Sequence, residues 1–260
     1  MLAPQRQERI LEEVRAHGGA RVSDLVAVLG VSDMTVRRDL EALAARGLVA
    51  RVHGGAATPA GRAAVEPGFS AKSALQRPEK LAIAALAVSL VQPGDSVALS
   101  AGTTTHAVAL ALRAVPDLTV VTNSLPVAQA LHDAGREPAH VVLTGGVRTP
   151  SDALVGPVAV AALRDLHVDW LFLGAHGVEE RAGLTTPNLV EAQTDQALLA
   201  AARRVAVVAD STKWGVVGLT TIAPLEGLDV LVTDEGLPPD ARRAVAERVG
   251  RLLLAPVGAP

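Results

Sequence analysis

Residues 32–40 read Ser-Asp-Met-Thr-Val-Arg-Arg-Asp-Leu, and this stretch decides the fold of the first part of the chain. Val36, Leu40 and Leu43 recur at helical spacing, which predicts a helix with these three side chains facing inward. Ser32 is a typical N-cap residue, and Gly47 predicts the end of the helix. Thr35, Arg37 and Arg38 then face outward near its N-terminus.

The flanking residues complete a small helical domain. Residues 5–17 carry apolar residues on one helical face, and Ser23-Asp24 is an N-cap signal for a short helix containing Leu25 and Leu29. Gly30-Val31 predicts the tight turn before Ser32. We therefore expect a helix-turn-helix at about residues 20–39. Residues 48–52 alternate and end in His53-Gly54-Gly55, which predicts a hairpin, or wing, closing a domain of residues 1–57.

The outward residues of this helix suit DNA recognition, because the N-terminal part of a recognition helix meets base edges in the major groove. An arginine can bind guanine through two hydrogen bonds, and a threonine can contact a phosphate or a thymine methyl group. The alternative is that Arg37 and Arg38 are ordinary solvated charges paired with Asp39 or Glu41. The predicted DNA-binding residues are Ser32, Thr35, Arg37, Arg38, Arg51 and His53.

The rest of the chain has a different pattern. Residues 58–76, rich in Gly, Pro and Ala at their start, are predicted to be a linker, and residues 77–260 alternate amphipathic helices with short Val/Leu strands. This alternation predicts an α/β domain with a mostly parallel sheet and helices on both faces. The expected strands are 96–100, 118–122, 140–144, 168–173, 204–209, 229–233 and 251–255.

Polar residues follow several of these strands. The carboxyl ends of parallel strands meet at one edge of a sheet, where ligands bind. Backbone N–H groups, hydroxyls, Arg and Lys suit a phosphate there, while amides and carboxylates suit sugar hydroxyls. Each motif alone is also explained by capping, a turn or a surface charge. The predicted effector-binding residues are Ser100, Gly102, Thr103, Thr104, Thr105, Asn123, Ser124, Gly145, Gly146, Arg148, His176, Glu191 and Lys213.

The composition of the chain excludes several kinds of site and several classes of protein. The chain has no Cys, which excludes disulfides, thiolate metal sites and a Cys nucleophile, and we expect no metal or cofactor. No apolar run is long enough for a membrane span, and the N-terminus is too polar for a secretory leader, so we expect a cytoplasmic protein. The net charge of −3 predicts that any DNA contact depends on locally placed arginines.

The first sixty residues resemble a known family. Arg6, Ile10 and Val14, followed by Ser32, Thr35 and the run Val36-Arg-Arg-Asp-Leu40, look like the helix-turn-helix signature of the DeoR family of bacterial regulators, and LAARGLVARVHGGA resembles its wing and hinge. This resemblance implies a homodimeric or homotetrameric regulator, usually a repressor, that binds an operator in double-stranded DNA.

The second domain resembles the effector domain of the same family. GTTT, LTVVTNSLPVA, LTGG-R, DWLFLGAHGV and ADSTKWG occur in the family's order between about residues 69 and 234. The resemblance implies a fold similar to ribose-5-phosphate isomerase and the coenzyme A transferases, and a phosphorylated sugar or related metabolite as effector. The chain departs from the family at three positions. The family often has an Asp before the Gly-Thr-Thr loop, where this chain has Ser100, and it usually has an Arg in place of Lys72 and a Lys in place of Asp195. An anion at position 195 would disfavour a phosphate if it points into the site.

Two other functions are alternatives to a transcriptional regulator. A sugar-phosphate isomerase-like enzyme with an appended DNA-binding domain would need an acid–base pair, for which Glu191, Asp210 and His176 are the candidates. Against it, the isomerase's acidic loop is not found, and no catalytic residue is predicted. A metabolite-binding module that has lost DNA contact is the third hypothesis, and the intact Thr35, Arg37 and Arg38 argue against it.

Overall fold

The computed structural model describes residues 3–17, 19–45, 48–52, 54–57, 69–73, 75–132 and 140–258. The chain divides into two compact units, residues 1–62 and residues 63–260, and each is described by itself. The predicted linker 58–76 lies outside the described residues except for 69–73, 75 and 76.

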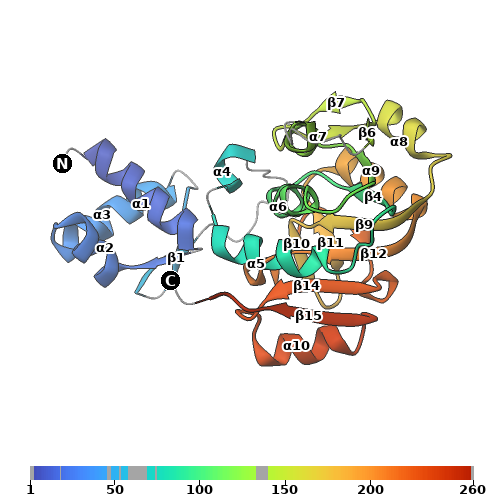
Figure 1. Cartoon of the computed structure of the whole chain (residues 1–260). Coiled ribbons are helices and arrows are strands. Elements are labelled where there is room, and N and C mark those ends of the chain that lie inside the picture. Colours follow the sequence, from blue (N-terminus) through green and yellow to red (C-terminus); the bar gives the residue numbers. More distant parts are fainter. Residues whose placement is uncertain are drawn as a thin grey trace. The chain divides into compact units, whose positions relative to one another are not determined.

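The N-terminal unit is a three-helix domain with a small antiparallel sheet. Its core is formed by Ile10, Val14, Leu25, Leu40 and Leu43, which are all buried. The strands occur in the order β1-β3-β2, so the predicted wing is a hairpin joined by a third strand that the sequence pattern did not predict. The elements are α1 (Ala3–His17), β1 (Gly19–Arg21), α2 (Val22–Leu29), α3 (Asp33–Ala45), β2 (Ala50–Val52) and β3 (Gly55–Ala57) (Figure 1).

The turn between α2 and α3 follows the prediction, but the start of α2 does not. Gly30 has φ 64°, a left-handed conformation that glycine adopts without steric cost, and it ends α2. The proposed cap at Ser23-Asp24 is wrong: α2 begins at Val22, and its N-cap Arg21 provides no side-chain cap. The reason is tertiary, because Arg21 is also the last residue of β1 and the N–H of Val22 donates to the carbonyl of Gly54.

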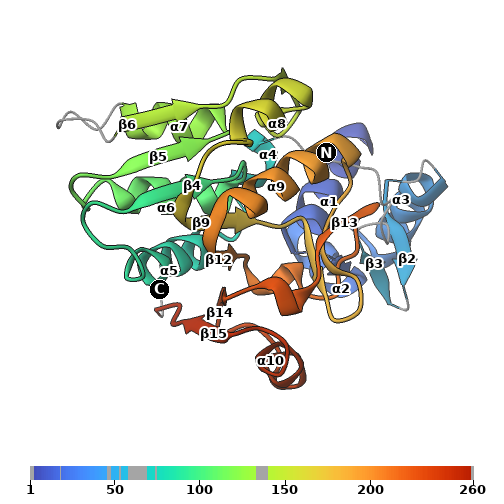
Figure 2. The ribbon, with the colours of Figure 1, turned by 90° about the vertical axis from the view of Figure 1, so that its right-hand side faces the viewer.

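The C-terminal unit is built on a seven-stranded sheet in which every neighbouring pair is parallel. This confirms the predicted sheet. The strand order is β15-β14-β12-β9-β4-β5-β6, which can be followed across Figure 2. The strands are β4 (Ser96–Leu99), β5 (Thr119–Thr122), β6 (His140–Leu143), β9 (Val168–Gly174), β12 (Ala202–Val208), β14 (Val230–Asp234) and β15 (Arg251–Ala255).

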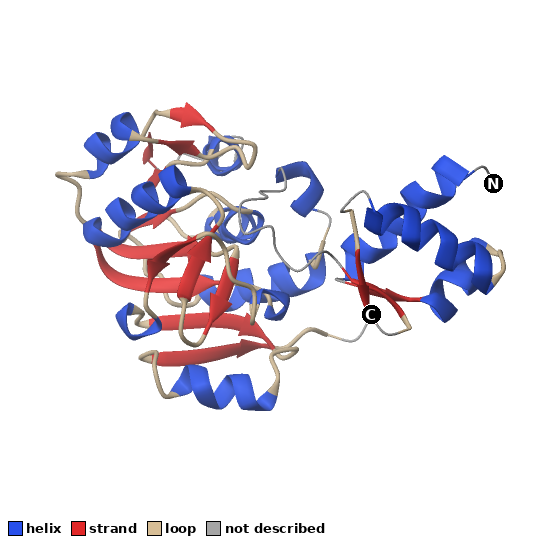
Figure 3. Ribbon diagram, turned by 180° about the vertical axis from the view of Figure 1, so that it is seen from behind, coloured by secondary structure: helices blue, strands red, loops and turns tan. Residues whose placement is uncertain are grey.

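Helices cover both faces of this sheet, and alternate residues of the strands from β5 to β15 enter two separate cores (Figure 3). Trp170 and Phe172 of β9 pack with α5 (Arg77–Val88), α6 (Thr103–Leu112) and α7 (Leu125–His132). Leu171 and Leu173 pack on the opposite side. The helices of that side are α8 (Pro157–Leu163), α9 (Leu189–Ala201) and α10 (Pro239–Ala246). Successive residues of a strand point to opposite faces, and both faces are covered by helices. Buried parallel strands are therefore continuous apolar runs in the sequence.

The C-terminal unit also contains short elements that the sequence did not predict. They are the hairpin β7 (Val147–Arg148) and β8 (Leu154–Val155), the antiparallel sheet of β10 (Gly177–Glu179), β11 (Gly183–Thr186) and β13 (Thr220–Ala223), the helix α4 (Phe69–Ser73), and the 3₁₀ turns η1 (Ser211–Lys213) and η2 (Leu225–Gly227).

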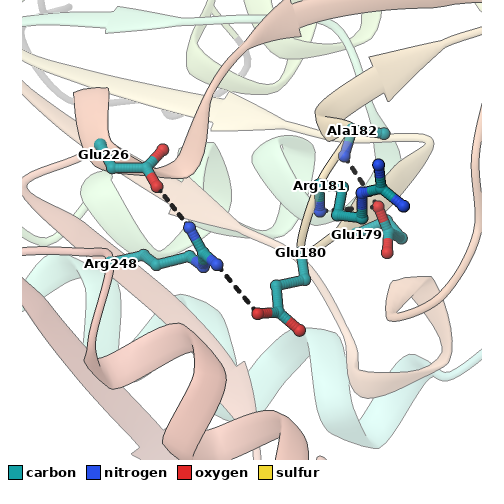
Figure 4. A network of polar contacts seen from close by, with 6 residues as sticks. All are labelled: Glu179, Glu180, Arg181, Ala182, Glu226 and Arg248. Atoms are coloured by element: carbon teal, nitrogen blue, oxygen red, sulfur yellow. Dashed lines mark hydrogen bonds and ion pairs between the residues drawn. The ribbon is translucent and has the colours of Figure 1, made fainter.

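Arg248, two residues beyond α10, links the sheet of β10, β11 and β13 to the rest of the unit. Its guanidinium donates to Glu180 in the β10–β11 turn at 2.9 Å and to Glu226 of η2 at 2.7 Å (Figure 4). Glu179 accepts hydrogen bonds from the backbone N–H groups of Arg181 and Ala182, which closes the turn.

Candidate nucleic-acid interface and sensor site

Helix α3 has one buried face and one open face. Val36, Leu40 and Leu43 are 0–2% exposed, as the spacing predicted. On the outside, Met34, Arg37 and Arg38 follow one another at i, i+3 and i+4, so they share a face. Met34 is 79% exposed, and both arginines are exposed. Met34 was missed by the sequence-based prediction, in which only polar residues were considered.

Ser32 and Thr35 build the N-terminus of α3. The Oγ atoms of Ser32 and Thr35 lie 2.9 Å apart, and the N–H of Thr35 points to Ser32 Oγ at 3.3 Å. The backbone N–H groups of Thr35 and Val36 also donate to the carbonyl of Ser32. This N-cap is the predicted one, and it fixes where the open face begins.

Arg37 is held by Asp33 and not by either of the proposed partners. Its Nε lies 2.5 Å from Asp33 Oδ1, and its Nη2 lies 3.3 Å from Oδ2. The hydrogen bond to Asp33 raises the pKa of Arg37 further above its ordinary value. The paired groups are about half exposed, so water and salt screen the interaction. Among the described residues, the Arg38 guanidinium makes no ion pair.

In the wing, the buried side chains of Val49 and Ala56 are described, whereas β2 is described only in its backbone. Arg51 lies on β2 opposite Ala56 of β3. The side chain of Arg51 and the whole of His53 lie outside the described residues, so their predicted DNA contacts stay predictions.

The carboxyl edge of the parallel sheet brings three loops of the C-terminal unit together. Ser100 follows β4, and its Oγ accepts from the N–H of Gly174 at the end of β9 at 3.0 Å. Asn123 follows β5, and its side chain bridges two loops: Oδ1 accepts from Ala101 N at 3.0 Å, and Nδ2 donates to Leu154 O at 3.2 Å. Both Ser100 and Asn123 are buried, so their polar atoms shape the edge from within.

The loop before α6 presents its threonines unequally. Thr104 and Thr105 are buried, and Thr105 Oγ1 donates to the carbonyl of Gly102 at 3.0 Å. Thr103 is half-buried, and Gly102 is the N-cap and has no side chain to occupy the first N–H groups of the helix. Those N–H groups therefore suit an anion. Ser124 is fully buried and caps α7 through Val127 N.

Gly145 and Gly146 lead into the β7–β8 hairpin. Gly146 has φ 125°, and a Cβ there would lie 2.6 Å from the carbonyl oxygen of Val155, so only glycine fits. Arg148 is exposed and paired with Asp152, with Nη2 2.6 Å from Oδ1. The structure thus turns Arg148 toward its own hairpin.

Two carboxyl groups lie together on α9. Glu191 is half-buried and accepts from Thr186 Oγ1 at 2.9 Å, while Asp195, one turn later, is 5% exposed. Burial, and secondly the charge of Glu191, hold the pKa of Asp195 well above its ordinary value. This raised pKa favours the protonated, neutral form of Asp195 over the anion that the sequence suggested.

The last two predicted effector residues, His176 and Lys213, are half-buried. His176 follows β9, and Lys213 ends η1 after β12. Lys80 of α5, which the sequence-based prediction missed, lies within electrostatic range of Lys213, Lys72 and Asp210. Lys80 was not predicted because it lies in a helix whose sequence is mostly apolar and not in a polar loop after a strand.

Two kinds of site are absent from the described residues. No group of three or more His, Asp or Glu side chains is placed to hold a metal ion. None of the described helices combines the length and the apolar character that crossing a bilayer requires.

Comparisons with known proteins match both units. Residues 6–61 match the model of the DeoR-like helix-turn-helix domain, and residues 75–235 match that of the DeoR C terminal sensor domain. The HTH-type transcriptional regulator GlpR of Haloferax volcanii is 40% identical over 94% of this chain and 95% of its own. The lactose phosphotransferase system repressor of Streptococcus mutans is 34% identical over 90% and 93%. A solved ribose 5-phosphate isomerase from Methanocaldococcus jannaschii is 20% identical, with a TM-score of 0.38 over 52% and 53% of the two chains.

Proposed function

This chain belongs to the DeoR family of DNA-binding transcriptional regulators, and we propose that it represses a carbohydrate-catabolism operon until a phosphorylated sugar binds its sensor domain. The observation that carries the proposal is the open face of α3, where Met34, Arg37 and Arg38 project from a helix whose other face is buried.

We propose that this face reads the operator. Arg38, which makes no ion pair among the described residues, would bind guanine through two hydrogen bonds, and Met34 would meet a thymine methyl group. Ser32 and Thr35 would contact phosphates beside the helix N-terminus, and Arg51 and His53 the flanking DNA. A homodimer or homotetramer would place two such helices on repeated half-sites.

Selection from a random DNA library tests this proposal. The full chain should enrich a repeated half-site, and Arg38→Ala should weaken its binding by roughly 1–3 kcal/mol and relax specificity at one position. Arg164→Ala, which removes an exposed arginine at the end of α8, is the matched control and should bind as the wild type does. A folded Arg38→Ala protein with unchanged affinity and sequence preference would show that α3 does not read the bases.

The proposed effector is a phosphorylated sugar bound at the carboxyl edge of the sheet. The N–H groups at the start of α6 and the Thr103 hydroxyl would take the phosphate, with Gly145 and Gly146 allowing close approach. Glu191 and His176, both half-buried, would bind sugar hydroxyls. The buried Ser100, Thr105, Asn123 and Ser124 would hold these loops in place.

A thermal-shift screen of phosphorylated sugars tests the effector. A ligand that binds the folded chain raises its melting temperature by mass action. The stabilising sugar phosphate should also lower operator affinity, because a repressor is released only by a ligand that prefers the DNA-incompetent arrangement. The unphosphorylated sugar is the control. We further propose that the ligand is bound and not converted, and recovery of an isomerised sugar after incubation would contradict this.

A further inference from the structure

Asp195 is a buried acid without a partner. The residue is 5% exposed, and its carboxyl group makes no hydrogen bond and no ion pair among the described residues. Nearly all buried polar groups of folded proteins have a hydrogen-bond partner, and a group that has none is a candidate for a functional role. Asp195 is such a candidate on α9.

The carboxyl group of Asp195 is also not enclosed. Among the described residues, the fully enclosed side-chain atoms that lack a partner are Glu79 Oε2 and Trp170 Nε1, and neither oxygen of Asp195 belongs with them. An oxygen that has no partner and is not enclosed retains contact with accessible space. A small group of a ligand can therefore reach Asp195.

The position of α9 places Asp195 beside the proposed effector site. Ala98 of β4 packs in the core that α9 covers, and α9 lies in front of the sheet in Figure 2. Alternate residues of a strand share a face, so Ser100 continues the side of Ala98 at the carboxyl edge. The N–H of Gly156, after β8, donates to Thr194 Oγ1 of α9 at 3.2 Å. The helix thus meets the loops at that edge from the side on which Asp195 lies.

Glu191 is a second acid on the same face, because it lies four residues before Asp195 on α9. Its Oε2 accepts from Thr186 Oγ1 at 2.9 Å, and its charge is one of the two influences that raise the pKa of Asp195, after burial. No basic side chain of the described residues is among those influences. The two acids therefore form a locally negative site.

The elements packed against α9 bring no other charge to this site. Among them, α8, β8, β11 and β13 contain no titratable residue within their described bounds. Those of β9 and β12 are Asp169, Arg203 and Arg204, which lie near the amino ends of their strands, away from the effector loops. A cation at this site would have to come from a ligand.

We propose that Glu191 and Asp195 form a binding site for an ammonium group, and that the effector is accordingly a phosphorylated amino sugar. The inference rests on the proposed function, because it names the chemical class of the effector of the sensor domain. An ammonium group has three donors, so it can serve both carboxyl groups at once. It takes the place of one hydroxyl group of a neutral sugar.

The charge of the site favours an ammonium group over a hydroxyl group. A carboxylate is costly to bury unless a cation compensates it, and an ammonium group beside Asp195 provides that compensation. Hydrogen bonds between ionised groups are also roughly twice as strong as those between neutral groups. A metal ion fits less well, because no described group of three His, Asp or Glu side chains is placed to hold one.

Titration calorimetry of the full chain with matched sugars tests this inference. The probes are the 6-phosphates of glucosamine and galactosamine, of glucose and galactose, and of the two N-acetylated amino sugars, all at pH 7. Within each series the compounds differ only in carrying an amine, a hydroxyl or an acetamide at the same carbon. At least one amine should bind about tenfold more tightly than its hydroxyl and acetamide counterparts, as expected when a charged hydrogen bond replaces a neutral one.

Asp195→Asn separates the charge of the site from its shape. The variant should bind the amine and the hydroxyl sugar with equal affinity, because the amide offers an acceptor without a negative charge. If Asp195→Asn does not fold, Glu191→Gln replaces it, and the same loss of preference is expected. Asp165→Asn removes an exposed carboxylate and should keep the preference of the wild type.

The inference is overturned if neither amine binds more tightly than its hydroxyl counterpart, or if folded Asp195→Asn keeps the preference for the amine. Tight binding of a hydroxyl sugar phosphate without such a preference would overturn the inference and leave the proposed function standing. Operator binding without ligand is measured separately, and its failure would contradict the proposed function alone.

Discussion

Arg6 of α1 and Asp39 of α3 form an ion pair inside the DNA-binding unit, with Arg6 Nε 2.5 Å from Asp39 Oδ2. The other carboxylate oxygen accepts from Gln7 Nε2 at 3.1 Å, and both charged side chains are largely shielded from water. Asp39 immediately follows Arg37 and Arg38, so this pair fixes how the open face of α3 is presented. Two residues that looked like a family signature in the sequence are therefore structural partners.

Asp39→Asn should lower both the melting temperature of the N-terminal unit and the operator affinity. The amide oxygen can accept a hydrogen bond but carries no negative charge, which leaves the shielded Arg6 charge uncompensated. Calorimetry with a DNA titration measures both effects. Asp24→Asn, an exposed change on α2, should alter neither melting nor the position of α3. Normal stability of Asp39→Asn would mean that the pair is dispensable.

Asp33→Asn should strengthen operator binding. It removes a negative charge from the end of α3 that is proposed to face the operator, and it releases Arg37 from its ion pair. If Arg37 then gains a phosphate contact, the slope of log affinity against log salt steepens by about 0.9. Titrations at several salt concentrations measure this, with Asp24→Asn as the charge-matched control. A weaker complex would show instead that Asp33 preorganises Arg37 for DNA.

Asn123→Ala should destabilise the C-terminal unit strongly. It leaves Ala101 N–H and Leu154 C=O without their hydrogen-bond partner. Each buried polar group without a partner lowers the free energy of unfolding by roughly 1–3 kcal/mol. Asn188→Ala loses the N-cap of α9 and should cost only about 1 kcal/mol. Urea denaturation of both variants compares the free energies of unfolding. Equal losses would mean that Asn123 does not tie the loops together.

Asp195→Asn should raise the melting temperature at pH 7 and not at pH 4. The pKa of Asp195 is raised by burial and by Glu191, so the folded chain binds more protons than the unfolded chain above the ordinary pKa of an aspartate. Stability then falls as pH rises from that value toward the raised pKa. Asparagine does not titrate and avoids this loss. Asp165→Asn, at an exposed position, should show no such pH dependence; a gain of equal size at both pH values would refute the explanation.

The sequence alone determined those features that depend on local spacing. The period of Val36, Leu40 and Leu43 predicted the buried face of α3, and the runs of Val and Leu predicted the seven strands of the parallel sheet and the helices between them. The short strands β1, β7 and β10 escaped prediction, because two or three residues carry too little pattern to distinguish a strand from a turn.

Only the tertiary structure decided which polar residues work together. Asp39 pairs with Arg6, which lies 33 residues earlier, and Asn123 joins loops that are 22 and 31 residues away. Lys80 of α5 lies within electrostatic range of Lys213 in η1. Such partnerships depend on the positions of whole elements, which no local pattern encodes. The same holds for Asp195: its sequence neighbours predict an anion, whereas its charge state follows from burial that arises only when α9 packs on the sheet.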